Sequence, residues 1–147
     1  MKKLNIFFMV MMLMVSVSVN AQQYTKSTVK GIANGFISTL MQGNLKGTLY
    51  FFDPSYVAEE HDNFLEGRTE QFVAEFLAGN VKKDYYAITP QLDRIKSIKV
   101  KKTFCDLEKD EIYADVKILM DYGVKYTVRL QLRVTDSGDL RFIGAVG

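Results

Sequence analysis

The segment YVAEEHDNFLEGR, residues 56–68, contains His61, the only histidine of the chain. Carboxylates stand close to it at Glu59, Glu60 and Asp62. A histidine beside a carboxylate can act as a general base, because the carboxylate orients the ring and favours its protonated form. A general base also needs a protected position, and this segment is polar at most positions. The pattern therefore favours a hydrated surface loop, and it leaves His61 as a candidate catalytic residue.

A metal site in the same segment is a weaker alternative. One histidine with three carboxylates could hold a divalent ion, but consecutive side chains rarely converge on one point. The chain has no Cys/His cluster with the spacing of a zinc site and no glycine-rich phosphate loop. We therefore expect no metal and no cofactor.

Tyr126 is the second candidate catalytic residue. It lies in residues 124–134, where apolar and polar residues alternate as in a strand with one buried side. The apolar side of this strand and of residues 114–120 carries no Asp or Glu. The Tyr126 hydroxyl could donate to a ligand, although a buried tyrosine more often donates to a protein acceptor. A pocket on this side would be apolar, which favours binding over acid–base catalysis.

The remaining reactive and charged residues have structural interpretations. Cys105 is the only cysteine, so no internal disulfide is possible, and a half-buried structural thiol near a strand end is expected. Lysines recur at 96, 99, 101 and 102, where alternation places Lys99 and Lys101 on one face. Together these two could meet an acidic partner or an anionic surface. We favour an edge strand protected by lysines.

The N-terminus has the composition of an export signal. Residues 1–3 are positively charged, residues 6–19 are apolar apart from two serines, and small or compact residues precede position 22. The apolar stretch is shorter than the roughly 20 residues of a membrane span. We therefore expect residues 1–21 to be a removed signal peptide, with an uncleaved anchor as the alternative. Residue 22 is Gln, so no lipid anchor is expected, and the protein should be exported, periplasmic or extracellular.

Residues 22–147 have a normal length for a single domain with one core. The chain has 19 Lys and Arg against 17 Asp and Glu, and two of the lysines lie in the signal, so the domain carries no net charge. A neutral domain has no general field that attracts nucleic acid. The polar side of the 124–134 strand does not resemble a large apolar dimer interface, although a homodimer stays possible.

Helices are predicted in the first half of this domain. A helix capped at Thr25 or Ser27 has its apolar residues at spacings of three and four and should stop at residues 43–44. A short helix over about 45–52 should end before Pro54, and a third over 70–77 should be capped by Thr69. The apolar stripe of the first helix comprises Val29, Ile32, Phe36, Ile37, Leu40 and Met41.

From residue 95 onward the apolar period changes from 3.6 to 2, which predicts an antiparallel meander. The first strand, residues 95–104, is interrupted at Lys102, which suggests a bulge or an edge. Two three-residue loops containing glycine, 121–123 and 136–138, set the pairing of the other strands. The expected pairs are Met120–Val124, Ile118–Tyr126, Val116–Val128, Ala114–Leu130, Asp115–Arg129, Leu132–Phe142 and Arg133–Arg141. One apolar sheet face needs cover, and helices supply it, so the fold class is α+β.

Two stretches carry a resemblance to a known superfamily. FISTLMQGNLKGTLYFFDPSYV, residues 36–57, and EGRTEQFVAEFLAG, residues 66–79, followed by the meander, resemble the nuclear transport factor 2-like superfamily. The resemblance implies a cone: N-terminal helices packed on a curved antiparallel sheet that ends in a four-stranded meander, with a pocket between them. It also implies a first strand after the Asp53-Pro54 turn. Members include isomerases, dehydratases and epoxide hydrolases, which place Asp, His or Tyr inside the cone, and many non-catalytic domains.

These expectations combine into one functional hypothesis. We expect a non-catalytic binding domain for a small apolar ligand or a protein partner. The alternatives are a cofactor-independent isomerase, dehydratase or hydrolase that uses Tyr126 or His61, and a structural subunit with a solid core. Tyrosines 85 and 86 could line the mouth of the cone or pack a loop. The expected ligand pocket comprises Phe36, Leu40, Phe52, Tyr56, Phe72, Phe76, Val116, Ile118, Tyr126 and Val128.

Overall fold

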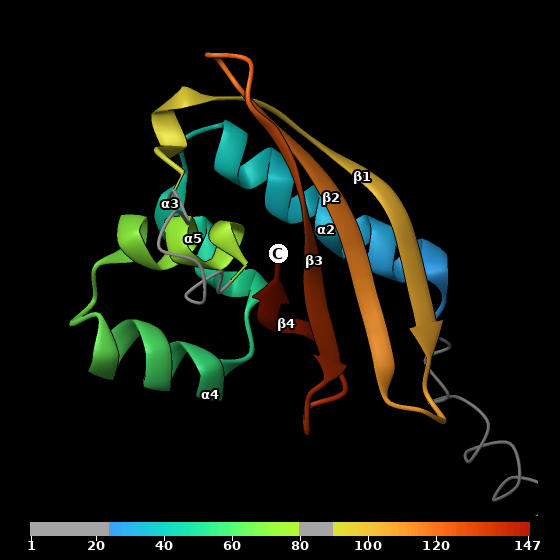
Figure 1. Ribbon diagram of the computed structural model, residues 1–147. Helices are drawn as coiled ribbons and strands as arrows, with labels where there is room; N and C mark the ends of the chain where they lie inside the picture. The colour runs from blue at the N-terminus through green and yellow to red at the C-terminus, as the bar shows by residue number, and fades with distance from the viewer. Residues whose placement is uncertain (1–23, 80–89) are drawn as a thin grey trace, which may run out of the picture.

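The computed structural model describes residues 24–79 and 90–147. The fold is α+β, with helices followed by a curved four-stranded antiparallel sheet, and Figure 1 shows the helices gathered on one side of that sheet. The expected signal peptide and the tyrosines at 85 and 86 lie outside the described residues. In the described part of the chain, no helix combines the length and the apolar character that crossing a membrane requires.

Helix α2, Lys26–Met41, lies across the sheet and packs on β1 and β2. Its N-cap is Thr25, which forms a reciprocal capping box with Thr28, so the predicted cap is confirmed. The helix ends where Gly43 takes a φ of +78°, a conformation that glycine adopts at little cost. Most of the predicted stripe is buried or half-buried, but Met41 is 46% exposed because it lies at the end of the helix, beyond the core.

The second helix is confirmed as α3, Leu45–Thr48, continued by a 3-10 turn, Leu49–Phe51. The strand expected after Asp53 is wrong. Asp53 instead caps a new helix, accepting a hydrogen bond from the Ser55 amide, and Pro54 occupies its first position. This helix, α4, Pro54–Tyr56, runs directly into a π-helix, Val57–Phe64. A single parallel bridge from Phe52 to Phe142 is all that extends the sheet at this point.

Helix α5, Thr69–Ala78, packs on β4 and ends at Gly79, whose φ is +70°. Its N-cap is Arg68 rather than the predicted Thr69. Thr69 is the first helical residue, and its hydroxyl bonds elsewhere.

A 3-10 turn, Leu92–Arg94, precedes the sheet. The sheet has four strands, which lie side by side in the order of the chain: β1 (Ile95–Asp106), β2 (Glu111–Met120), β3 (Lys125–Val134) and β4 (Leu140–Val146). Every predicted cross-strand pair is observed, and the Met120 amide donates to the Val124 carbonyl at the first hairpin. The register of β1 shifts between Val100 and Lys102, which confirms the bulge. β1 is also an edge strand, as the lysines indicated.

One face of the sheet is buried against the helices, but the end of this face near the β2–β3 hairpin is only partly buried. Val128, Leu130 and Leu132 are buried, whereas Tyr126 is half-buried and Val124 is 45% exposed. Figure 1 shows the β2–β3 hairpin extending beyond α2 and α5. The 3-10 turn Leu92–Arg94 contacts its tip, because the Asp121 amide donates to the Arg94 carbonyl at 2.8 Å. The apolar side of the sheet is therefore less completely buried at the hairpin end than in its middle.

Candidate functional site

The residues predicted to line a pocket form much of the core. Eight of the ten are buried, and Tyr56 and Tyr126 are half-buried. At one end the space is filled by phenyl rings: Phe52 lies with its ring centroid 4.7 Å from that of Phe76 and 5.7 Å from that of Phe36. Phe142, which the prediction did not include, completes this cluster at 5.4 Å from Phe36. This part of the interior is therefore packed solid.

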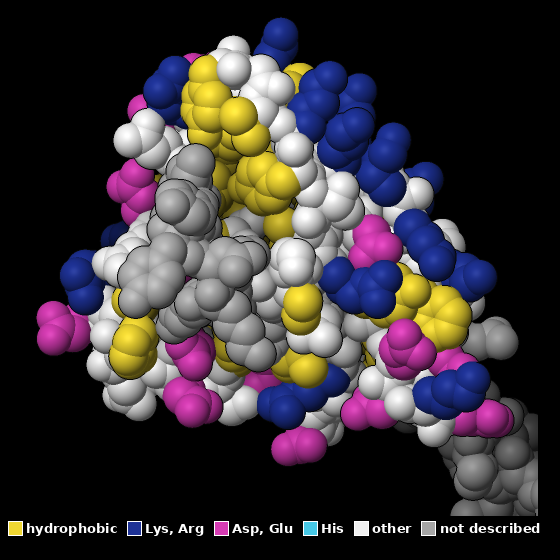
Figure 2. Space-filling model, viewed as in Figure 1, with side chains coloured by type: hydrophobic (Ala, Val, Ile, Leu, Met, Phe, Trp, Pro, Cys, Tyr) yellow, Lys and Arg dark blue, Asp and Glu magenta, His cyan; other side chains and the backbone are white. Residues whose placement is uncertain are grey.

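The other end of the interior, near the β2–β3 hairpin, is different. Figure 2 shows apolar side chains gathered at this end of the molecule. We call the inward side of β2 and β3 here, which carries Ile118, Met120 and Tyr126, the sheet hollow. Tyr126 lies on the inward side of β3, opposite Ile118, at this end of the sheet. Its hydroxyl oxygen is buried and has no hydrogen-bond partner. Burial, with a smaller contribution from Tyr122, raises the pKa of Tyr126 to about 12, so the hydroxyl keeps its proton at neutral pH.

His61 is buried, only 7% exposed, so the predicted surface loop is wrong. Val57, His61 and Leu65 recur every fourth residue and face inward from the π-helix and its end. This spacing was present in the sequence, but the polar residues between them concealed it. The imidazole packs edge-on against Phe72, with ring centroids 5.4 Å apart and planes at 81°.

Both imidazole nitrogens of His61 have partners. Nδ1 lies 2.6 Å from Oδ1 of Asp62, and Nε2 lies 2.9 Å from Oγ1 of Thr69. Among the three carboxylates near His61 in the sequence, Asp62 is the one that makes one of these two contacts with the ring. The sequence interpretation did not include Thr69 in a site, because eight residues separate it from His61.

Thr69 also lines a groove of about 750 Å³. One wall is the start of α5, residues 68–71 and 74, and the other is residues 90–93. Within the described residues, the N-cap residue of α5, Arg68, makes no side-chain cap hydrogen bond, and the hydroxyl of Thr69 bonds to His61. None of the ten predicted pocket residues lines this groove.

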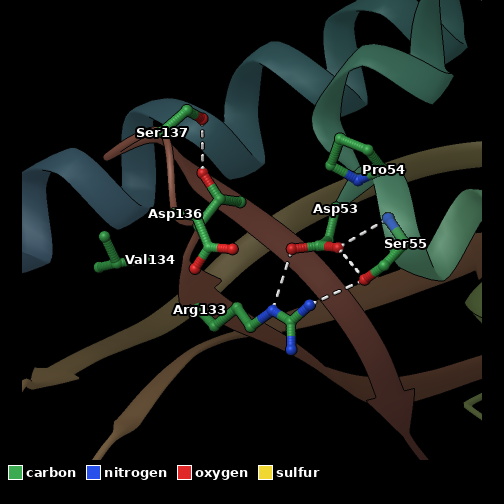
Figure 3. Close-up of a pocket in the computed structure, with 8 residues that line it drawn as sticks. Asp53, Pro54, Ser55, Arg133, Val134, Asp136 and Ser137 are labelled. Carbon is green, nitrogen blue, oxygen red and sulfur yellow. Dashed lines mark hydrogen bonds and ion pairs between the residues drawn. The ribbon is translucent and has the colours of Figure 1, made fainter.

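A second cavity, of about 520 Å³, lies between the start of α4 and the end of β3 (Figure 3). On its wall, Nε of Arg133 donates to Oδ2 of Asp53 at 2.9 Å, and Nη2 donates to Oγ of Ser55 at 2.9 Å. The Ser55 hydroxyl also donates to Asp53. We call these three residues the α4 clasp, because they fasten α4 to the sheet.

The electrostatics of the α4 clasp are those of a structural ion pair. Asp53 is only 4% exposed, and chiefly the hydrogen bond from Arg133 holds the pKa of its carboxyl far below the usual range. The predicted pairing of Arg133 with Arg141 exists, but each of these arginines has a carboxylate partner, Asp53 for the first and Asp139, at 3.5 Å, for the second. An Asp before Pro is a helix-start signal that could have predicted the cap, but not the arginine 80 residues away.

Cys105 is half-buried near the end of β1, as predicted. Its thiol donates to the carbonyl of Tyr24 at 3.6 Å, and burial raises its pKa, which disfavours the reactive thiolate. Within residues 24–79 and 90–147, no group of three or more His, Cys, Asp or Glu side chains could hold a metal ion.

Comparison with known proteins adds no assignment: no family model matches the chain, and no match is found among curated proteins or solved structures. The resemblance to the nuclear transport factor 2-like superfamily therefore stays a prediction.

Proposed function

We propose that this chain is an exported binding domain that takes a small, mainly apolar molecule with one hydrogen-bond acceptor into the sheet hollow and catalyses no reaction on it there. The observation that carries the proposal is the Tyr126 hydroxyl, a buried donor without a partner. Leaving such a group unpaired costs about 1–3 kcal/mol. A ligand acceptor placed beside it would recover that cost on binding.

The surroundings of Tyr126 support binding rather than acid–base chemistry. The inward residues of β2 and β3 are aliphatic apart from this tyrosine, so no carboxylate reaches it from these two strands. With its pKa at about 12, the hydroxyl is a donor at neutral pH and not a base. An apolar wall with one fixed polar group is the usual composition of a small-molecule site.

The experiment uses two naphthalenes of the same shape, 2-acetylnaphthalene, which has a carbonyl acceptor, and 2-isopropenylnaphthalene, which has none. Their affinities are measured by fluorescence for the wild-type protein and for Tyr126→Phe, after unfolding and refolding to remove retained molecules. We expect the wild type to prefer the ketone by about 3- to 10-fold, the effect of one net hydrogen bond. In Tyr126→Phe this preference should disappear.

Two results would contradict the proposal. If neither naphthalene binds, the sheet hollow does not accept apolar ligands. If the ketone preference persists in Tyr126→Phe, or is absent from the wild type, the hydroxyl is not the recognition group. Mass spectrometry of molecules retained by the purified protein would then identify the natural ligand class directly.

A further inference from the structure

We propose that the Thr69 hydroxyl is a nucleophile for acyl transfer from small carboxylic esters, with His61 as its general base and Asp62 as a positioning residue. The proposed site opens into the groove at the start of α5. It is separate from the sheet hollow and does not depend on the binding function proposed above.

The hydrogen bonds determine which nitrogen of His61 carries the proton. A carboxylate can only accept, so the 2.6 Å contact from Oδ1 of Asp62 requires a hydrogen on Nδ1. The neutral ring then has its lone pair on Nε2, which lies 2.9 Å from Oγ1 of Thr69. In the neutral ring, the hydroxyl therefore donates to Nε2. A hydroxyl that donates to an imidazole nitrogen is placed to lose its proton to that nitrogen when it attacks a substrate. The contact is therefore more than packing between two helices.

Burial holds the His61 ring in place, whereas the side chain of Asp62 is 60% exposed. His61 is 7% exposed, and the edge contact with Phe72 limits rotation of its ring. The body of the ring is therefore shielded from solvent, whereas the hydroxyl beside Nε2 lines an open groove through which a substrate or a water molecule can approach. A base held in a fixed orientation beside an accessible nucleophile is what acyl transfer requires.

The N-terminus of α5 supplies the third requirement. The helix has ten residues, Thr69 is the first of them, and the N-cap residue Arg68 makes no side-chain cap hydrogen bond in the part of the chain that the structure describes. The first amides of a helix have no partner within it, so they remain available to an oxygen that becomes negative in the groove. Amide donors at such a position stabilise the tetrahedral intermediate of acyl transfer.

The reaction balances without a cofactor. Oγ1 of Thr69 bonds to the carbonyl carbon of the ester while its proton passes to Nε2 of His61. The carbon–oxygen bond to the alcohol then breaks, and the alcohol leaves with that proton. Water, deprotonated by Nε2, attacks the acyl-threonine, releases the carboxylic acid and restores the hydroxyl. A groove of about 750 Å³ is large enough for a small ester.

The test measures hydrolysis of p-nitrophenyl acetate and covalent labelling by a fluorophosphonate, located by peptide mass spectrometry. The variants are Thr69→Val, which keeps the shape and removes the hydroxyl, and Thr127→Val, the matched control on the exposed side of β3. We expect label on Thr69 in the wild type, a loss of hydrolysis of about 100-fold in Thr69→Val, and no change in Thr127→Val. Thr69→Ser should retain both label and hydrolysis.

Asp62→Asn tests the positioning role. An amide can donate to Nδ1 and so stabilise the other tautomer, which places a hydrogen on Nε2. We expect hydrolysis near neutral pH to fall by about tenfold or more, with partial recovery at alkaline pH, whereas a merely structural contact would leave the pH profile unchanged.

The proposal is overturned if the wild type shows no label on Thr69, or if Thr69→Val hydrolyses the ester as fast as the wild type. The second result would assign the hydrolysis to other groups. Should Thr69→Val fail to fold, the labelling of the wild type decides alone. Tyr126→Phe should not affect either readout, so failure here and failure of the binding proposal are distinguishable.

Discussion

Replacing Tyr126 with Phe should stabilise the ligand-free protein, contrary to the usual effect of a substitution in a partly buried position. Phe keeps the ring on the inward side of β3 and removes only a hydroxyl that is buried without a partner. An unpaired buried hydroxyl costs about 1–3 kcal/mol. We expect the free energy of unfolding to rise by about 1–2 kcal/mol.

Tyr24→Phe is the matched control, because it removes the same atom where the atom has a partner. The Tyr24 hydroxyl donates to the carbonyl of Gly138 in the β3–β4 hairpin. Its removal should lower the free energy of unfolding by about 0.5–1.5 kcal/mol. The two identical chemical changes are thus expected to act in opposite directions.

Urea unfolding at pH 7, followed by circular dichroism, measures both effects on protein that has been refolded without ligand. With an unchanged urea dependence, a gain of 1 kcal/mol moves the midpoint upward by roughly 0.3–1 M. The reasoning is refuted if Tyr126→Phe loses stability as Tyr24→Phe does. That result would mean that the hydroxyl is already satisfied in the free protein and has no capacity reserved for a ligand.

Three further predictions concern the framework. Because the folded-state pKa of Asp53 is depressed, its contribution is present above the ordinary carboxyl pKa and is lost in acid. Asp53→Asn should therefore lower the free energy of unfolding at pH 7, and its difference from the wild type should shrink as the pH falls below 4. Urea unfolding at several pH values measures this difference. A difference that does not change with pH would contradict the ion pair. Lys99→Glu should raise stability by about 0.2–1 kcal/mol, since Lys99 directly faces Lys117 across β1 and β2. The gain should vanish in 1 M salt, and a gain that salt leaves intact would exclude this cause. Gly79→Ala should lower the midpoint of thermal unfolding, because φ is +70° there and a Cβ would lie 2.3 Å from the amide nitrogen of Gly147. Gly31→Ala should raise this midpoint, because Gly31 is exposed in α2 and a Cβ there would have nothing within 4 Å. Equal effects of the two substitutions would contradict both arguments.

The sheet was predictable from the sequence because its determinants are local. Alternation of apolar residues assigns a buried side to each strand, and a one-residue slip would turn every side chain to the wrong face. The hairpin loop that contains Gly123, with a φ of +88°, then sets the pairing. These two constraints predict that Met120 pairs with Val124 and, further along the strands, that Asp115 pairs with Arg129. The side chains of Asp115 and Arg129 form two hydrogen bonds, of 2.8 and 3.1 Å.

The region around the candidate sites was not predictable in the same way. Residues 57–64 are mostly polar, and a run of polar residues in a short stretch of sequence predicts a loop. Their π-helix exists because Pro54 and Asp53 start a helix and because the core accepts one side of it, including His61. Tertiary packing thus decided the environment of the histidine.

What the sequence alone determined is the fold class, the strand register and the identity of Tyr126 and His61 as the residues to consider. What only the tertiary structure decided is their partners. The Thr69 hydroxyl reaches His61, and Arg133 reaches Asp53 across 80 residues, through contacts between separate elements. The Tyr126 hydroxyl has no such contact. Hydrogen bonds depend on tenths of an ångström between side chains that the chain brings together only on folding, whereas alternation and turns depend on neighbours in sequence.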